Sequence, residues 1–452
     1  MKIYLHIEIL VRELDSRLLL AVLAAARGHE VVLGDIPSLY FGARKRALPP
    51  GVLLTKSLTP SAKKIARHRE LQNQSFVITS IDEESGLATF NGRAEFTRQR
   101  FSRETLQQAS AAFCWGREEQ DALTTMFPDL ADKAVLTGSP RVDLWRPQFA
   151  SYWTDSPSIP SRPFLLISSN FGLSNSLRLL HEDLTMRAGL GYFAHDDSEF
   201  KRTLGIYVEG WKLIIDFVEA IKHLSHLSDS FDIVLRPHPG ENEDTWKVLL
   251  DGIPNVHVIR EGNIAPWVRK AFAVLHNGCT TAFEARIIGT PVVAYTPFSQ
   301  EFEITAPNDL SKRIRNLDEL GREITRLFEC HQEESISSEH FSPLPDELLE
   351  KISIDRDELA AEKILNFWET LNIPEIGVTG GWLRYRFFLA ISAISLRFRG
   401  RKKQEKLTSR KYPGLDMDDI QSKVNRLRKL LGVGNEISLT RFSNKVFLVR
   451  AK

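Results

Sequence analysis

FAVLHNGCTTAFEARIIGTPVVAY, residues 272–295, runs from an apolar segment through a polar loop and a helix into a second apolar segment. Residues 272–275 predict a strand, and Thr280 or Thr281 predicts the N-cap of a helix that stops at Gly289. Residues 291–295 predict the next strand. This alternation is typical of an open parallel α/β sheet, in which ligands bind at the carboxyl ends of the strands.

The loop between the first strand and the helix has the composition of an anion site. Asn277 and Gly278 leave the strand, and Thr280 and Thr281 begin the helix. A helix N-terminus offers backbone N–H groups and the positive end of the helix dipole, which suit a phosphate. Glu284, one turn into the helix, could reach a ribose hydroxyl. The alternative is an ordinary strand–loop–helix junction in which a threonine caps the helix and nothing binds.

A second loop of the same kind follows the strand predicted in FDIVLRPHPG, residues 231–240. Arg236 and His238 come at the end of this strand, and Pro237 and Pro239 stiffen the backbone around them. A cation beside an imidazole fits a phosphate clamp, and a histidine can also donate a proton to a departing phosphate. The alternative for His238 is simple packing against a neighbouring loop. Two loops of this kind in one domain favour a ligand that carries phosphate.

Length and composition indicate a globular protein of more than one domain. The chain has 452 residues, of which 42% are hydrophobic and 26% charged, and its net charge is +1. Such a balance gives no general attraction to nucleic acid, so we expect no nucleic-acid partner. Cys114, Cys279 and Cys330 lie far apart, which fits a reducing cytoplasm and gives neither a zinc site nor a disulfide framework.

The N-terminal sequence predicts a βαβ opening, with a strand over 3–9, a helix over 16–27 and a strand over 30–33. Charged residues interrupt its apolar run, so we expect neither a signal peptide nor a membrane span. A Ser/Pro-rich linker over 151–161 precedes a new strand over 164–168. We therefore predict an N-terminal Rossmann-like domain over 1–150, a second over 151–345, a cleft between them and a helical extension over 346–452.

An acidic cluster, Asp82, Glu83 and Glu84, follows the strand predicted over 76–81. Adjacent carboxylates repel one another, so we expect a raised pKa for at least one of them. Such a group can act as a general base on an acceptor hydroxyl or as a nucleophile toward an anomeric carbon. The alternative is a solvated acidic turn. Asn170, at the end of the strand over 164–168, is a further candidate that could touch a donor sugar or merely turn the chain.

The region Trp382–Lys403 mixes aromatic and basic residues. Its apolar run over 387–396 is too short to span a bilayer but suits a helix that lies in an anionic membrane surface. The alternative is a helix that packs its apolar face on the protein. We expect a cytoplasmic protein that associates peripherally with the inner face of the cytoplasmic membrane.

Several motifs occur in an order that resembles a known family: RELDSRLLLAVLAAARGHEVVLGD, IDEESGLATF, FCWGREEQDAL, VLTGSPRVDLWRP, RPHPGE and HNGCTTAFEARIIGTPVVAY. Together they resemble the bacterial surface carbohydrate biosynthesis proteins. That family is similar to the GT-B glycosyltransferases that use CMP-activated acidic sugars, among them the retaining β-Kdo transferases of capsule and O-antigen assembly. The resemblance covers about residues 1–302 and implies a GT-B-like fold.

The resemblance also implies roles for individual residues. His238 with Pro239 would contact the nucleotide phosphate, and Thr280 with Thr281 would bind the same phosphate. The catalytic carboxylate would come from the acidic motif over 82–86, where Ser85 interrupts the pattern and leaves the choice between Glu83 and Glu84 open.

The function implied is transfer of an acidic sugar such as Kdo from a CMP-activated donor to a glycan or lipid-linked glycan of capsule, O-antigen or lipopolysaccharide. No Asp-x-Asp metal motif stands out in the loops expected to face the cleft, so we expect neither a metal nor a cofactor. Two alternatives stay open, namely a CDP-polyol phosphotransferase and a non-catalytic scaffold of polysaccharide assembly. A nucleotide-sugar epimerase is conceivable on fold alone, and fold does not fix function.

Overall fold

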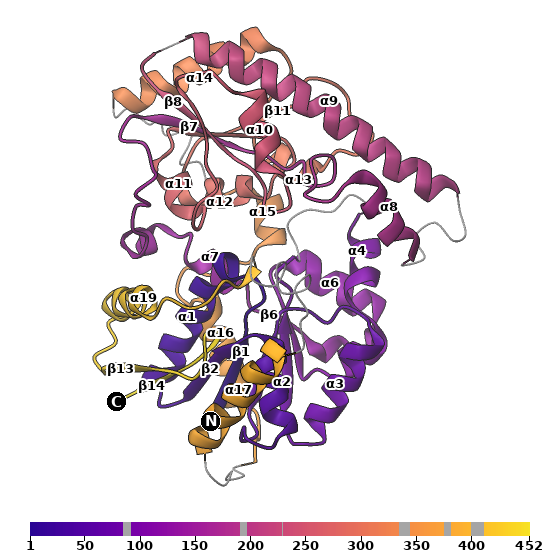
Figure 1. Cartoon of the computed structure of the whole chain (residues 1–452), viewed down its shortest axis with the longest axis vertical. Helices are drawn as coiled ribbons and strands as arrows, with labels where there is room; N and C mark the ends of the chain where they lie inside the picture. The colour runs from indigo at the N-terminus through magenta and orange to yellow at the C-terminus, as the bar shows by residue number, and fades with distance from the viewer. Residues whose placement is uncertain (85–91, 190–196, 228, 334–343, 375–380, 399–410) are drawn as a thin grey trace. The chain divides into compact units, whose positions relative to one another are not determined.

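The computed structural model describes residues 1–84, 92–189, 197–227, 229–333, 344–374, 381–398 and 411–452 (Figure 1). These residues form two compact units. The first holds the described residues up to Tyr152 and those from Leu349 to Lys452, and the second holds those from Trp153 to Leu348. Each unit is an α/β structure with its own sheet, which confirms the predicted class of two Rossmann-like domains.

The sheet of the first unit has eight strands in the order β13-β14-β2-β1-β3-β4-β5-β6. The strands β1 to β6 are mutually parallel, whereas β14 runs antiparallel to both β2 and β13. Their bounds are β1 Lys2–His6, β2 Glu30–Gly34, β3 Val52–Thr55, β4 Val77–Ile81, β5 Ala111–Cys114, β6 Ala134–Leu136, β13 Ile437–Arg441 and β14 Val446–Ala451.

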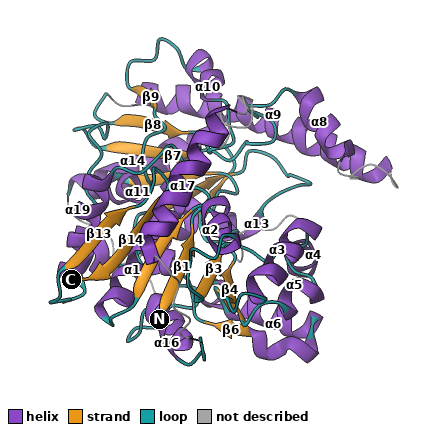
Figure 2. Cartoon of the chain, turned by 60° about the horizontal axis from the view of Figure 1, so that its bottom comes forward, coloured by secondary structure: helices purple, strands orange, loops and turns teal. Residues whose placement is uncertain are grey.

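Helices flank these strands (Figure 2). From the N-terminal part they are α1 Leu10–Ala26, α2 Ile36–Arg44, α3 Ala62–Gln72, α4 Gly92–Arg100, α5 Arg103–Gln107, α6 Arg117–Met126 and α7 Pro140–Asp143, with the 3₁₀ turns Pro128–Lys133 and Pro147–Tyr152. From the C-terminal part they are α16 Ala360–Glu369, α17 Gly381–Phe398 and α19 Met417–Leu430. The sequence boundary between the two units falls inside α15, Asp346–Lys351.

The C-terminal region differs from the separate helical tail predicted over 346–452. It completes the first unit, because β14 pairs with β2 and Trp368 of α16 is fully buried. The indole N–H of Trp368 donates to the Thr79 hydroxyl of β4 at 3.1 Å. A fully buried tryptophan that also satisfies its polar atom anchors this segment to the core. The described residues from Leu349 onward are therefore part of the first unit.

The sheet of the second unit has six parallel strands in the order β12-β11-β10-β7-β8-β9. Their bounds are β7 Phe164–Ser168, β8 Asp232–Arg236, β9 Val256–Val258, β10 Ala273–His276, β11 Val292–Tyr295 and β12 Lys312–Ile314. The helices are α8 Leu180–Gly189, α9 Asp197–Leu227, α10 Glu243–Leu249, α11 Ala265–Lys270, α12 Thr281–Ile288, α13 Thr305–Asp309 and α14 Leu317–Gln332. The strand predicted over 164–168 is confirmed residue for residue.

Candidate functional site

The second sheet reverses its strand order between β7 and β10. The chain adds β8 and β9 on one side of β7 and then returns to add β10, β11 and β12 on the other side. A crevice opens at such a reversal at the carboxyl ends of the two strands, and it is where open α/β sheets bind ligands. The predicted residues Asn170, Asn277, Gly278, Thr280 and Thr281 follow these two strands.

The loop after β10 has a fixed backbone. Gly278 adopts φ +60°, and its N–H donates to the side-chain oxygen of Asn308 at 2.8 Å. A Cβ at position 278 would meet Ile304 at 3.0 Å, so both the dihedral angle and the space favour glycine. The Asn277 side chain is buried and donates to the Tyr295 carbonyl at 2.8 Å. Asn277 therefore shapes the loop through its side chain.

The two threonines at the start of α12 have different surroundings. Thr280 occupies the N-cap position, is exposed and makes no side-chain cap hydrogen bond. Thr281 is buried, and its hydroxyl pairs with the Ser168 hydroxyl at 3.0 Å and with the Cys279 sulfur at 3.3 Å. The exposed hydroxyl at the positive end of the helix is that of Thr280, which makes it the better placed of the two for an anion.

The histidine of the second loop is exposed and held in one orientation. The backbone N–H of Gly240 donates to Nδ1 of His238 at 3.1 Å. Because Nδ1 accepts this hydrogen bond, the neutral ring carries its proton on Nε2. Gly172, in the loop after β7, lies against the ring, since a Cβ there would be 3.2 Å from Nδ1. The loops after β7 and β8 thus meet at His238.

Glu241 is the functional residue that sequence reasoning missed. It is fully buried, and Oε1 accepts hydrogen bonds from the Ser169 hydroxyl at 2.9 Å, the Phe171 N–H at 2.9 Å and the His238 N–H at 3.1 Å. Its Oε2 accepts from the indole of Trp246 at 2.7 Å. One buried carboxylate therefore fixes the loops after β7 and β8 together. Its position directly after RPHPG was the only signal in the sequence.

Arg236 and Glu284 lie deeper than the sequence predicted. Arg236 is buried, donates to the carbonyls of Glu261 at 2.7 Å and Gly262 at 3.0 Å, and stacks over Trp267 with 4.7 Å between guanidinium carbon and ring centre. Burial lowers its pKa to about 10, against the opposing charges of Glu284 and Glu261. Glu284 is also buried. The pair places a buried cation and a buried carboxylate beside the site.

Asn170 joins the two strand ends. Its side-chain amide donates to the Gly278 carbonyl at 2.9 Å, across the switch point. Beside it, His276 ends β10 fully buried, with Nδ1 accepting from the Cys279 N–H at 3.3 Å and Nε2 paired with the Ser311 hydroxyl at 2.8 Å. Burial, with a smaller effect of Arg313, lowers the pKa of His276 to about 3. His276 is a neutral part of the scaffold.

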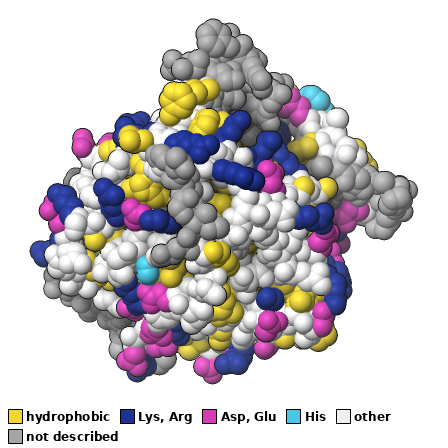
Figure 3. All heavy atoms as spheres, turned by 90° about the horizontal axis from the view of Figure 1, so that it is seen from below, with side chains coloured by type: hydrophobic (Ala, Val, Ile, Leu, Met, Phe, Trp, Pro, Cys, Tyr) yellow, Lys and Arg dark blue, Asp and Glu magenta, His cyan; other side chains and the backbone are white. Residues whose placement is uncertain are grey.

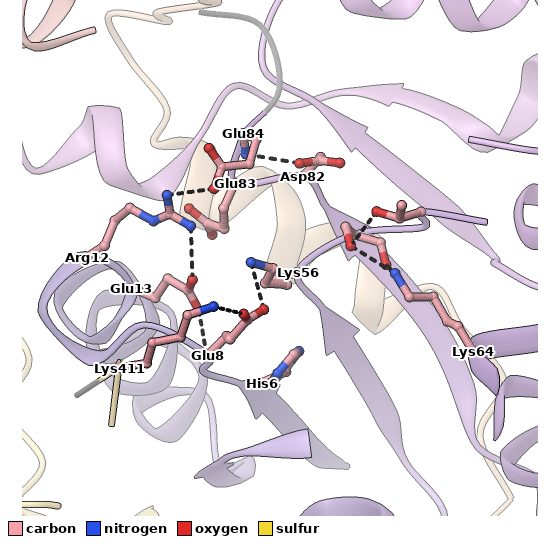
Figure 4. Close-up of polar contacts among 12 residues, drawn as sticks. His6, Glu8, Arg12, Glu13, Lys56, Lys64, Asp82, Glu83, Glu84 and Lys411 are labelled. Atoms are coloured by element: carbon pink, nitrogen blue, oxygen red, sulfur yellow. Dashed lines mark hydrogen bonds and ion pairs between the residues drawn. The ribbon is translucent and has the colours of Figure 1, made fainter. Parts of the chain in front are cut away.

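The first unit gathers charge at its own switch point, between β1 and β3 (Figure 4). The acidic cluster follows the neighbouring strand β4. Asp82 is buried and forms a bidentate ion pair with Arg100, at 2.6 and 2.7 Å. Glu83 is buried and pairs with Arg17 at 2.8 Å. Both carboxylates are neutralised inside the protein.

Glu84 differs from its two neighbours. Its side chain is 45% exposed and pairs with Arg12 at 2.6 Å. Partial burial alone would raise its pKa, but the charge and hydrogen bond of Arg12 outweigh burial and lower it. The prediction that repulsion raises a pKa in this cluster is therefore wrong for Glu84, because an arginine faces it. The end of the predicted motif, Ser85 and Gly86, lies outside the described residues.

Further polar side chains share this edge (Figure 4). Glu8 forms ion pairs with Lys56 at 2.7 Å and Lys411 at 2.9 Å. Burial alone would raise the pKa of Glu8, but the two lysines outweigh burial and lower it to about 2. Lys64 donates to the Ser57 carbonyl and hydroxyl at 3.0 and 2.9 Å, and burial lowers its pKa to about 8. His6, the last residue of β1, is buried, which lowers its pKa to about 3.

Comparison with known proteins gives distant structural likenesses. No family model and no curated protein matches the sequence. The UDP-GlcNAc 2-epimerase of Neisseria meningitidis bound to UDP-GlcNAc is 14% identical, with a TM-score of 0.49, over 82% of this chain and 100% of that chain. MnaA of S. aureus with UDP is 12% identical, TM-score 0.48, over 83% and 100%. The wall teichoic acid polymerase TagF is 11% identical, TM-score 0.38, over 71% of each chain.

Proposed function

We propose that this protein is a metal-independent GT-B glycosyltransferase of surface polysaccharide biosynthesis. In the proposal it transfers an acidic sugar such as Kdo from a CMP-activated donor to a glycan or lipid-linked glycan at the inner face of the cytoplasmic membrane. The second unit binds the nucleotide, and the first supplies a carboxylate for the chemistry.

One observation carries the nucleotide site. Three loops at the carboxyl ends of β7, β8 and β10 are joined by hydrogen bonds: Asn170 links the first to the third, and Glu241 links the first to the second. A site built in advance loses little entropy on binding its ligand. The connected loops surround the switch point, where α/β sheets take nucleotides.

The site offers donors suited to a phosphate. Thr280 sits exposed at the N-terminus of α12, and the Nε2 proton of His238 comes from the neighbouring loop. In the proposal these groups, with the field of the buried Arg236, stabilise the negative charge that develops on the leaving phosphate. Stabilisation by fixed donors does the work that a divalent metal does in other transferases.

Glu84 is the carboxylate that we assign to catalysis. Asp82 and Glu83 are buried in ion pairs, whereas Glu84 is partly exposed and has a lowered pKa. A carboxylate with a lowered pKa is ionised at neutral pH and is a weak base. The assignment therefore favours attack on the anomeric carbon, or stabilisation of its positive charge, over general base catalysis.

A thermal-shift screen against CMP, CDP, UDP and GDP, each with and without EDTA, tests the proposal, since a ligand that binds the native state raises the melting temperature. We expect a shift with CMP that EDTA leaves unchanged. A CDP preference would favour polyol-phosphate transfer. A UDP preference would replace the CMP-sugar donor, and no shift with any nucleotide would favour the scaffold.

His238→Ala sharpens this screen. Loss of a hydrogen bond to a charged phosphate weakens binding by about tenfold to a hundredfold, and the exposed ring leaves the unfolding free energy nearly unchanged. His257→Ala, at a half-exposed histidine of β9 in the same unit, is the matched control. Equal affinity for nucleotide in the two variants would remove His238 from the phosphate site.

A further inference from the structure

Helix α17 has two opposite apolar faces, and among the described residues only one of these faces is packed against the protein. Tyr385 is fully buried, and its hydroxyl donates to the Ser38 carbonyl at 3.1 Å. Leu389 is buried in the same cluster, and Phe388 packs edge-on against Phe41 of α2, with ring centres 6.5 Å apart. The indole of Trp382 donates to Glu30 at 3.3 Å. These contacts fix the rotation of the helix about its axis.

The other face presents Leu383, Phe387 and Ile391 to solvent, with exposures of 76%, 63% and 43%. At 3.6 residues per turn, side chains four apart drift by roughly 40°, so these three form one stripe along the helix. Three large exposed apolar side chains in a row form a stripe that can bury apolar surface against a partner. Described helices of the chain are all too short or too polar to cross a bilayer.

The charge around the stripe identifies the partner. Arg384 and Arg386 lie on its two sides, and residues 381–403 contain no Asp or Glu. A hydrophobic stripe bordered by arginines matches an anionic lipid surface, because the apolar side chains enter the acyl region while the guanidinium groups stay among the phosphates. Residues 399–403, the end of the membrane segment expected from the sequence, lie outside the described residues.

A second stripe in the chain shows what is particular to α17. Helix α9 exposes Val208, Trp211 and Ile215 at 69%, 43% and 58%. Asp216 and Glu219 share that helix surface with Lys212 and Lys222, so it has no net positive charge to attract anionic lipid. Figure 3 shows the face of the molecule seen from below, where hydrophobic side chains lie beside Lys and Arg.

We infer that α17 attaches the protein to an anionic lipid surface through Leu383, Phe387 and Ile391, with Arg384 and Arg386 at the phosphates. The biological reason for this attachment rests on the proposed function, in which a lipid-linked glycan acceptor is held at the lipid surface. Its geometry rests on α17 alone. The attachment is peripheral and reversible, because a single short stripe gives modest binding.

Sedimentation of the full chain with vesicles tests the inference. We expect binding to vesicles rich in phosphatidylglycerol and little binding to pure phosphatidylcholine. Raising the salt from 0.1 M to 1 M shortens the Debye length from about 10 Å to about 3 Å and should release the protein. The triple variant Leu383→Ser, Phe387→Ser, Ile391→Ser should bind at least about tenfold more weakly, because its stripe no longer buries apolar surface in lipid.

The matched control is Val208→Ser, Trp211→Ser, Ile215→Ser on α9, which removes an equal apolar stripe and should sediment like the unaltered chain. Retained binding by the α17 variant would overturn the inference, as would no binding by the unaltered chain. The inference would also be overturned if the unaltered chain were a dimer and the α17 variant a monomer, because the stripe would then be a self-association surface. The nucleotide screen on the same preparations reports the proposed function separately.

Discussion

The two units have the same kind of topological switch point, but different types of polar contact hold the side chains there. At the β7–β10 switch point the contacts are hydrogen bonds among amides, hydroxyls and backbone groups, organised by Glu241 and Asn170. At the β1–β3 switch point ion pairs dominate, such as those of Glu8 with Lys56 and of Glu84 with Arg12. Parallel topology thus fixes where a site lies, and the side chains decide its chemistry.

The two switch points also differ in the charge of the ligand or group that they would stabilise. In the proposed function a phosphate needs donors that are already oriented, and the described loops after β7, β8 and β10 offer such donors without an exposed carboxylate. A carboxylate taken out of water is favoured in its ionised form by a cation beside it, and the first unit pairs each member of its acidic cluster with an arginine. Variants at the two switch points should therefore fail in different ways.

Glu241→Ala should have the largest effect. It leaves four donors, including the Phe171 N–H and the Trp246 indole, without their acceptor in a buried place. At about 1–3 kcal/mol for each unsatisfied group, the unfolding free energy should fall by at least about 4 kcal/mol. Urea unfolding measures the loss. Glu243→Ala, at a half-exposed ion pair with Lys247, is the control and should change it by less than about 1 kcal/mol.

Glu83→Gln and Glu84→Gln should separate stability from turnover. Glu83→Gln leaves Arg17 buried beside a neutral amide and should lower the unfolding free energy by about 3 kcal/mol. Glu84→Gln removes a partly exposed ion pair and should change stability by less than about 1 kcal/mol. Turnover of the donor found in the nucleotide screen should fall by about 10²-fold or more in Glu84→Gln. Full turnover in that variant would return the acidic cluster to a structural role.

Acid should weaken both switch points through their strand-end histidines. His6 and His276 have a pKa of about 3 in the folded chain because they are buried, against about 6.5 when unfolded. Below pH 6.5 the unfolded state therefore binds the proton first, and each histidine lowers the unfolding free energy by about 1.4 kcal/mol per pH unit down to about pH 3. His276→Gln should unfold with a shallower pH dependence between pH 6.5 and 5. A variant whose curve runs parallel to that of the unaltered chain would contradict the buried, neutral histidine.

Much of the fold was predictable because its strands are short apolar runs ended by turn residues. The strand over 164–168 and the stop of α12 at Gly289, which has φ +95°, were both predicted correctly. The helix α1 was placed too late, at 16 instead of Leu10. At its start the Glu13 carboxylate accepts the Glu8 N–H at 2.7 Å, and such a contact has no periodic signal in the sequence. The strands β13 and β14 were missed because they pair with each other and join the sheet only where β14 meets β2, far away in the sequence.

The site was predictable by position and less so by contact. Parallel topology brings strand-end residues to one edge, so the positions of Asn170, Asn277 and the two threonines at the β7–β10 switch point could be expected from the sequence, and their roles stay predictions. Which side chain faces solvent and which one holds the loop depends on packing. Arg236 shows this, because its guanidinium is occupied by two carbonyls and Trp267. Glu241 was one carboxylate among many until its four partners were known.

Gly172→Ala should have the smallest effect on stability and still reach the nucleotide site. A Cβ there would be 3.2 Å from Nδ1 of His238, so the ring must move by a few tenths of an ångström. The backbone dihedral does not require glycine, and the unfolding free energy should change by less than about 1 kcal/mol. Displacing the ring bends the Gly240-to-Nδ1 hydrogen bond that fixes the tautomer, so nucleotide should bind a few-fold more weakly. Gly189→Ala, where a Cβ meets nothing within 4 Å, is the control. Gly172→Ala could keep its nucleotide affinity while His238→Ala loses it. The imidazole would then be needed but its exact placement would not, and the β7–β10 switch point would be less rigid than its hydrogen bonds imply.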